Sequence, residues 1–207
     1  CVWCQIAHRK RETIAKASLA PRVILVLNLE RAQDGIKRLN VLVLRLSEAA
    51  RLEQALQTAE VESVDLTYLI NRCGEGYKLA YPESVIKVMT PSVKIEKKLS
   101  ADLFIQMLDK LVSNAVDFSS PNMPIEIILE KNKSTVIRII NYGSTLPEEM
   151  QAQLFNSMVS LRGKKDEQPH LGLGLYIAEL IAEFHNAEIT AHNLQQNEGV
   201  VFKIRFN

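Results

Sequence analysis

The sequence predicts an α+β fold, with a helical first third followed by a larger part in which helices and strands alternate. Apolar residues recur at helical spacing over residues 36–56 with almost no helix breaker. Beyond about residue 62, shorter apolar runs are separated by Pro, Gly and Asn. These elements lack the regular strand–helix–strand repeat of a parallel sheet, so we expect helices layered on one face of a mixed sheet.

Composition limits the class of protein. The chain has 207 residues, is 47% hydrophobic and carries a net charge of +1, so it is long enough for a real core and gives no reason to expect nucleic-acid binding. Cys1 and Cys4 have CxxC spacing without a second pair, so neither a zinc nor a redox site is expected. No run of eighteen apolar residues predicts a membrane span, although the basic residues 8–11 after the short segment 1–7 are compatible with the cytoplasmic edge of one.

The first third predicts a long helix with a bundle or coiled-coil seam, and such helices often dimerise. The seam residues recur at steps of three and four: Ile36, Leu39, Val43, Leu46 and Ala50. Residues 21–29 also have helical character, yet only Gly35 offers a turn between the two segments. Either one helix runs through, or a connecting segment is absent from this chain.

Shorter elements follow the acidic residues Glu60, Glu62 and Asp65. The patterns predict a helix over 65–73, strands over 84–90 and 93–99, and a helix to residue 118 capped by Ser100 or Asp102. A hairpin of strands 125–130 and 135–140 follows, and then a short helix starting at Pro147. The last predicted elements are a basic loop over 162–170, a helix ending at His185, and strands 187–193 and 200–206.

The helix ending at residue 118 has two different faces. Lys110, Asn114 and Asp117 share one narrow sector, whereas Leu108, Leu111, Val112 and Ala115 lie opposite. An amide such as Asn114 in the middle of an apolar helix is either exposed to water or bound to a polar partner such as a ligand. A hard cation such as Mg²⁺, itself bound to phosphates, suits an amide oxygen.

Two glycine-containing segments are further candidates for a binding site. Asn141 ends a predicted strand, and Gly143 after it would let a ligand approach the backbone. Gly172-Leu173-Gly174-Leu175 opens a helix, and helix N-termini favour anions. Taken alone, each segment is equally well explained as an ordinary turn or loop beside a core element.

Together, these segments resemble the ATP-binding domain of bacterial sensor histidine kinases. Residues 108–119, 141–149, 154–155 and 172–185 are similar, in order, to the N box, first glycine box, F box and second glycine box. The resemblance implies a two-layer α/β sandwich of the histidine kinase/GHKL (Bergerat) ATPase type over residues 63–207. It implies a helical dimerisation and histidine-phosphotransfer hairpin over residues 1–62. Residues 47–53 and 155–160 are also similar to kinases paired with dedicated sortase systems in proteobacteria.

The resemblance assigns roles to particular residues. Asn114 would be the magnesium ligand, and Asn141 stands where the family has an aspartate that accepts from the adenine amino group. Gly143, Gly172 and Gly174 would flank a lid of about residues 156–171. The remaining nucleotide-site candidates are Lys110, Asp117, Thr145, Arg162, Lys164, Leu173 and Leu175. Arg162, Lys164 and the adjacent Lys165 qualify as phosphate neighbours by charge alone.

Several positions depart from the family pattern. Lys110 replaces an amide or acid one turn before Asn114; it can contact phosphate but cannot ligate Mg²⁺. Asn141 replaces the aspartate, and Thr145 replaces the second glycine of the first glycine box.

No histidine precedes Pro21 where the phosphoacceptor is expected, and His8, followed by Arg9, is only a weak candidate. Residues absent from the chain near 16–30 would explain both this and the missing hairpin turn. A continuous backbone there would disprove that explanation.

The implied activity is transfer of the γ-phosphoryl group from Mg²⁺–ATP to a histidine and then to an aspartate of a response regulator. The implied setting is a homodimer formed through the N-terminal helices, without nucleic acid. It would be the cytoplasmic portion of a bacterial inner-membrane protein, membrane-associated only through a region outside this chain. Two alternatives remain. The first is an ATPase of the same superfamily, which is disfavoured because no carboxylate stands one turn before Asn114. The second is a non-enzymatic dimerisation scaffold whose nucleotide pocket has lost its function.

Overall fold

The computed structural model describes residues 50–147, 154–155, 174–195 and 198–206, with scattered positions between 28 and 48. The chain divides into two compact units, Cys1–Ser47 and Glu48–Asn207. His8, Pro21 and the junction of residues 19 and 20 lie outside the described residues, as does Glu30 at the junction of residues 29 and 30. None of the helices that the structure describes is long and apolar enough to cross a membrane.

In the first unit, the described positions are helical, as the periodicity predicts. Three predicted seam residues, Ile36, Leu39 and Val43, are 59%, 62% and 64% exposed. Their apolar side chains therefore face outward in the single chain.

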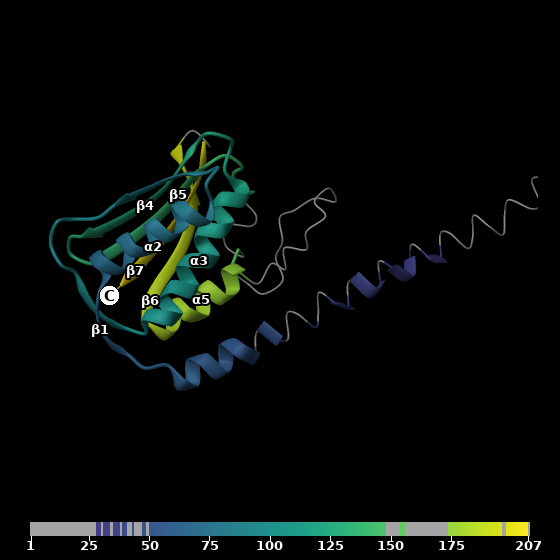
Figure 1. Cartoon of the computed structure of the whole chain (residues 1–207), viewed down its shortest axis with the longest axis horizontal. Coiled ribbons are helices and arrows are strands. Elements are labelled where there is room, and N and C mark those ends of the chain that lie inside the picture. Colours follow the sequence, from purple (N-terminus) through teal and green to yellow (C-terminus); the bar gives the residue numbers. More distant parts are fainter. Residues whose placement is uncertain are drawn as a thin grey trace, which may run out of the picture. The chain divides into compact units, whose positions relative to one another are not determined.

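The second unit is built on a mixed five-stranded sheet in the order β2-β4-β5-β7-β6. Its strands are β2 (Val85–Met89), β4 (Pro124–Lys131), β5 (Thr135–Tyr142), β6 (Ala187–Asn193) and β7 (Gly199–Phe206). Strands β2 and β4 are parallel, and the other neighbours are antiparallel. The helices α2 (Leu66–Ala80), α3 (Ala101–Phe118) and α5 (Gly174–Phe184) cover one face of this sheet (Figure 1). The predicted two-layer α/β sandwich is confirmed.

Period-two burial along the strands creates the core between these layers. In β5, Ile137 and Ile139 are fully buried, and their neighbours in sequence are only half-buried. Helix α3 supplies the largest share of the opposing layer, with seven buried residues: Leu103, Phe104, Met107, Leu108, Leu111, Val112 and Ala115. A helix with one apolar stripe and a sheet with one apolar face stabilise each other by burying both.

A small second sheet was not predicted from the sequence. The acidic stretch after residue 59 contains strand β1 (Glu62–Asp65), which pairs antiparallel with β3 (Glu96–Leu99). The strand predicted over 93–99 is thus shorter, and it pairs with β1 in a sheet separate from β2. Acidic residues have low strand propensity, so only the pairing partner, distant in sequence, reveals β1.

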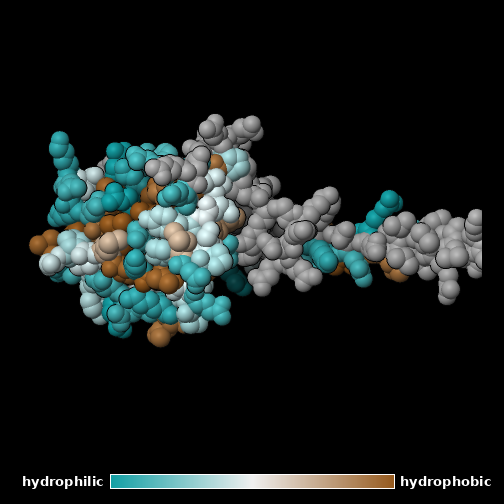
Figure 2. Space-filling view, turned by 90° about the horizontal axis from the view of Figure 1, so that it is seen from above, coloured by the Kyte–Doolittle hydropathy of each residue, from teal (hydrophilic) through white to brown (hydrophobic). Residues whose placement is uncertain are grey.

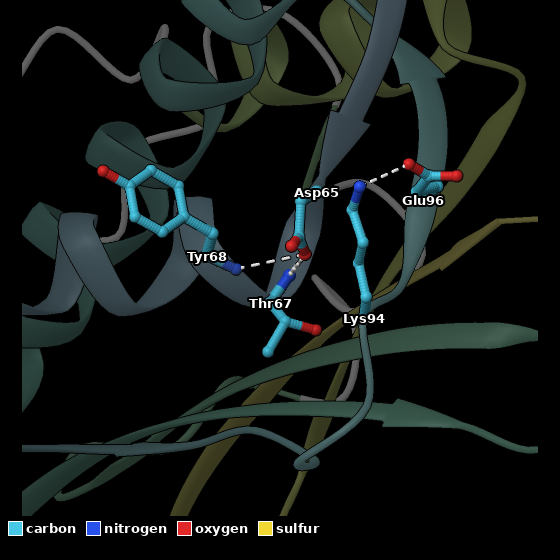
Figure 3. Close-up of polar contacts among 5 residues, drawn as sticks. All are labelled: Asp65, Thr67, Tyr68, Lys94 and Glu96. Carbon is cyan, nitrogen blue, oxygen red and sulfur yellow. Dashed lines mark hydrogen bonds and ion pairs between the residues drawn. The ribbon is translucent and has the colours of Figure 1, made fainter.

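Asp65 ends β1 and also caps α2 (Figure 3). Its Oδ1 accepts hydrogen bonds from the backbone N–H groups of Thr67 and Tyr68, at 3.0 and 3.2 Å. Nearby, Lys94 and Glu96 form an exposed ion pair at 2.6 Å. The cap satisfies two of the helix's unpaired N–H groups and fixes its start.

Helix α2 is longer than predicted, extending to Ala80 instead of ending near Cys73. Gly74 and Gly76 lie in the additional part of the helix. In the structure, Gly74 is buried and lies against β2, where an added Cβ would come within 2.2 Å of Val88 Cγ2. The glycine therefore serves close helix–sheet packing, which sequence periodicity does not reveal.

A helical segment over residues 50–58 also belongs to the second unit. Leu52 is 3% exposed and is part of the core, with Ala55, Leu56 and Ala59 packed against it. The division of the chain into domains 1–62 and 63–207 remains a prediction.

The surface of the described residues has no uniform character. On the face shown in Figure 2, hydrophobic residues form a band between hydrophilic ones. Surface hydropathy on this face therefore does not mark a functional site, and the site is defined by specific side chains.

Candidate functional site

The polar face of α3 faces away from the core, as predicted. Lys110 and Asn114 are half-buried, whereas Leu111, Val112 and Ala115 opposite are fully buried. Asp117, on the same polar side, is exposed. The rigid apolar stripe therefore fixes where the amide of Asn114 lies.

Backbone hydrogen bonds join the end of α3 to the segment after β5. The Ser120 N–H donates to the Tyr142 carbonyl at 2.7 Å, and the Ser144 N–H donates to the Phe118 carbonyl at 3.2 Å. Ser119 and Gly143 form an isolated antiparallel bridge between these two bonds. The segment carrying Asn114 and the first glycine segment are thus held as one corner of the domain.

Gly143 is required by this close approach. An added Cβ would come within 2.3 Å of the Phe118 carbonyl oxygen and 2.8 Å of the Ser120 nitrogen. Because these are backbone atoms, no side-chain rotation relieves the contact. The glycine that the sequence marks for ligand access also allows the two chain segments to touch.

Asn141 lies inside the same corner and is 1% exposed. It alternates with Ile137 and Ile139 on the helix-covered face of β5. Its Nδ2 donates to the Phe118 carbonyl in a long hydrogen bond of 3.5 Å. Within the described residues no hydrogen bond reaches its Oδ1, and a buried acceptor of this kind is uncommon unless a ligand or water satisfies it.

The start of α5 brings the second glycine segment to α3. A Cβ at Gly174 would lie 3.8 Å from Lys110 Cδ, so the two residues are neighbours without crowding. Leu175 is half-buried in the first turn of the helix. Gly172, Leu173, Arg162, Lys164 and Lys165 lie outside the described residues.

Lys110 has a partner that the motifs did not indicate. Its ammonium group forms an ion pair with the carboxylate of Glu48, and the two side chains are 31% and 29% exposed. Glu48 is separated from Lys110 by 61 residues of sequence, so no local signal links them.

Asn193 is a second residue that sequence reasoning missed. The Leu146 N–H donates to its Oδ1 and its Nδ2 donates to the Leu146 carbonyl, both at 2.8 Å. This paired contact holds the segment after Gly143 against the end of β6, next to the half-buried Thr145. An asparagine ending a strand gives only a turn signal, so the contact could not be foreseen.

His185 is a structural residue. Its Nε2 accepts from the Ser100 N–H at 3.0 Å, and its Nδ1 lies 2.8 Å from the Ile181 carbonyl. Ser100 is the N-cap residue of α3, but its own side chain makes no capping bond. Burial lowers the pKa of His185, because desolvation disfavours the charged ring, although the Ile181 hydrogen bond opposes this.

Comparison with known proteins identifies the class. Residues 100–207, just over half of the chain, match the family described as histidine kinase-, DNA gyrase B- and HSP90-like ATPases. The chain belongs to this family of ATP-binding domains. The matched region begins at the cap of α3 and includes every strand of the large sheet except β2.

The similar curated proteins are sensor kinases. The sensor protein CreC of Escherichia coli is 28% identical over 82% of this chain, and the sensor protein VanSC of Enterococcus gallinarum is 26% identical over 85% of it. The chain spans 35% and 49% of those proteins. The mycobacterial sensor histidine kinase MprB has the same fold, with a TM-score of 0.61 at 18% identity over 71% of this chain and 97% of that structure. The predicted resemblance to sensor histidine kinases is therefore confirmed.

Proposed function

We propose that this chain is the core of a sensor histidine kinase of a two-component system. It would bind Mg²⁺–ATP and transfer the γ-phosphoryl group to a histidine, from which the group passes to an aspartate of a response regulator. The observation that carries the proposal is that α3, which bears Asn114, contacts both other motif segments: its Phe118 carbonyl accepts from Asn141, and its Lys110 lies beside Gly174.

The adenine would bind at Asn141. The buried Oδ1 of this residue has no hydrogen bond within the described part of the chain, and it can accept from an exocyclic amino group. An amide at this position retains the acceptor that a carboxylate would offer. It lacks the negative charge, which a neutral purine does not require.

The phosphates would bind where α3 meets the start of α5. Asn114 offers an amide oxygen to the cation, and Lys110, beside Gly174, offers a positive charge to the phosphate oxygens. No group of three or more His, Cys, Asp and Glu residues that could hold a metal lies within the described ranges. A single amide ligand from Asn114 fits Mg²⁺, because this ion takes few protein ligands and completes its shell with phosphate oxygens and water.

Positioning and charge neutralisation supply most of the catalysis in phosphoryl transfer. The corner formed by α3 and the Gly143 segment would orient the nucleotide, and bound Mg²⁺ would neutralise charge developing on the phosphates. The lid predicted over residues 156–171, with Arg162 and Lys164, would exclude water. The proposal for the whole protein also includes an acceptor histidine, a homodimer contact, a location linked to the membrane and a response regulator as partner.

The first test is isothermal titration of Mg²⁺–ATP into the full chain and into Asn114→Ala. We expect wild-type binding that requires Mg²⁺ and that weakens by more than about tenfold, or about 1.4 kcal/mol, in the variant. Asn132→Ala is the matched control, because Asn132 is exposed in the turn between β4 and β5. It should bind as the wild type does.

Two outcomes separate the proposal from its alternatives. Absence of binding at millimolar nucleotide, by the wild-type chain and its variants, would favour the scaffold. Binding with steady release of inorganic phosphate, and no acid-labile phosphohistidine, would favour the ATPase. Phosphohistidine detected on this chain, or on a longer form supplying the acceptor, would support the kinase.

A further inference from the structure

Glu48 occupies a place in the site that neither the motifs nor the family match assigns. It precedes the matched region by more than fifty residues, yet its carboxylate contacts the ammonium group of Lys110 on the polar face of α3. Lys110 in turn adjoins Gly174 at the start of α5. The carboxylate is thus held at the end of the site where the phosphates are proposed to bind.

The direction of Glu48 follows from the helix that carries it. Positions four, seven and eight residues further along share its face, and they are Leu52, Ala55 and Leu56. Leu52 is buried in the core, and the other two pack against it. Docking of this one apolar face therefore aims the Glu48 carboxylate at Lys110.

We propose that Glu48 is an autoinhibitory residue: its carboxylate occupies Lys110 and competes with the phosphate groups of the nucleotide for that cation. This inference rests on the proposed nucleotide site. Phosphate oxygens and a carboxylate seek the same ammonium donors, and two anions close together repel each other. Because both side chains are mostly shielded from solvent, salt screens their interaction less than that of a surface pair.

Competition at Lys110 couples nucleotide binding to the helix of residues 50–58. A nucleotide that draws Lys110 away removes one contact that holds this helix on the domain, so the helix should open more often. By linkage, anything that pulls the helix away should strengthen nucleotide binding by the same factor. The ion pair therefore gives the segment before the ATP-binding domain a direct effect on the phosphate end of the site.

The test is a double-mutant cycle with Glu48→Gln and Lys110→Met in the full chain, measured by ATP titration with Mg²⁺ at low salt. Glu48→Gln keeps the shape of the side chain and removes its charge, so we expect ATP to bind about two- to fivefold more tightly. Lys110→Met should weaken binding and abolish the effect of Glu48→Gln. Glu53→Gln is the matched control: its carboxylate is exposed on the same helix, and affinity should not change.

A second readout follows the helix itself. Amide hydrogen exchange in residues 50–58 should rise in Glu48→Gln, and it should rise in the wild-type chain when ATP is added. Thermal unfolding of each variant would verify that the rest of the domain remains folded.

The outcomes distinguish this inference from the proposed function. If the wild-type chain binds ATP and Glu48→Gln leaves that affinity unchanged or lowers it, the inference is overturned and the proposed function stands. The same conclusion follows if Glu48→Gln still changes the affinity in the Lys110→Met background. Binding by Glu48→Gln when the wild-type chain binds too weakly to measure would support both. No binding by the wild-type chain or by any variant would overturn both.

Discussion

The tautomer of His185 is fixed by its two partners. The backbone N–H of Ser100 can only donate and the carbonyl of Ile181 can only accept, so Nε2 is unprotonated and Nδ1 carries the hydrogen. The ring therefore replaces the side-chain cap that Ser100 does not provide, and it links the end of α5 to the start of α3. His185 therefore has a structural role in the domain.

This role predicts a dependence of stability on pH. Burial lowers the pKa of His185 below its ordinary value of 6.5, so the unfolded chain binds the proton more readily than the folded one. Its contribution to stability is complete above about pH 6.5 and is lost as the pH falls through 6.5 toward the lower folded pKa. We expect a lower unfolding midpoint in urea at pH 5.5 than at pH 7.5.

His185→Phe should lower stability at pH 7.5 by about 1–3 kcal/mol, because the Ser100 N–H loses its acceptor. It should also reduce the difference between the two pH values. His192→Gln is the control, since His192 is exposed on β6, and it should keep that difference. A wild-type pH difference retained in His185→Phe would contradict the assignment.

At the scale of elements, α2 shows how packing overrides local propensity. Two glycines within three residues predict a helix end, but the helix continues because its buried face rests on β2. Gly74 allows that contact, whereas nothing lies within 4 Å of a Cβ at Gly76. The two positions therefore separate the packing role of a glycine from its intrinsic effect on a helix.

Alanine at each position should have opposite effects. Gly76→Ala should stabilise the domain by about 0.5–1 kcal/mol, because alanine is the better helix former. Gly74→Ala should destabilise it by about 1–3 kcal/mol, because the new methyl group meets the stiff, β-branched side chain of Val88. Urea unfolding of both variants measures the contrast, and equal shifts would refute the packing role.

At the scale of the whole molecule, the first unit has an apolar stripe without a partner among the described residues. Ile36, Leu39 and Val43 follow the three–four spacing of a helix seam, and all are more than half exposed. A stripe of this kind is typical of helices that pair with a second copy. It is the feature that supports the proposed homodimer.

Replacing Leu39 and Val43 by aspartate should convert the dimer to a monomer in sedimentation velocity, because charges would enter the helix seam. The unfolding midpoint of the ATP-binding unit should stay the same, since neither residue belongs to its core. As a control, Arg31→Gln, at an exposed position on the same unit, should leave the dimer intact. A wild-type chain that sediments as a monomer would contradict the dimer.

The sequence alone determined the fold class, the two faces of α3, all five strands of the large sheet and the family. These follow from periodicity and from four ordered motifs, which are local properties of the chain. Only the tertiary structure decided strand β1, the length of α2, the cap that His185 provides, and the contacts of Asn193 and Glu48. The reason is that each depends on a partner distant in the sequence, and local patterns carry no information about which distant residues will meet.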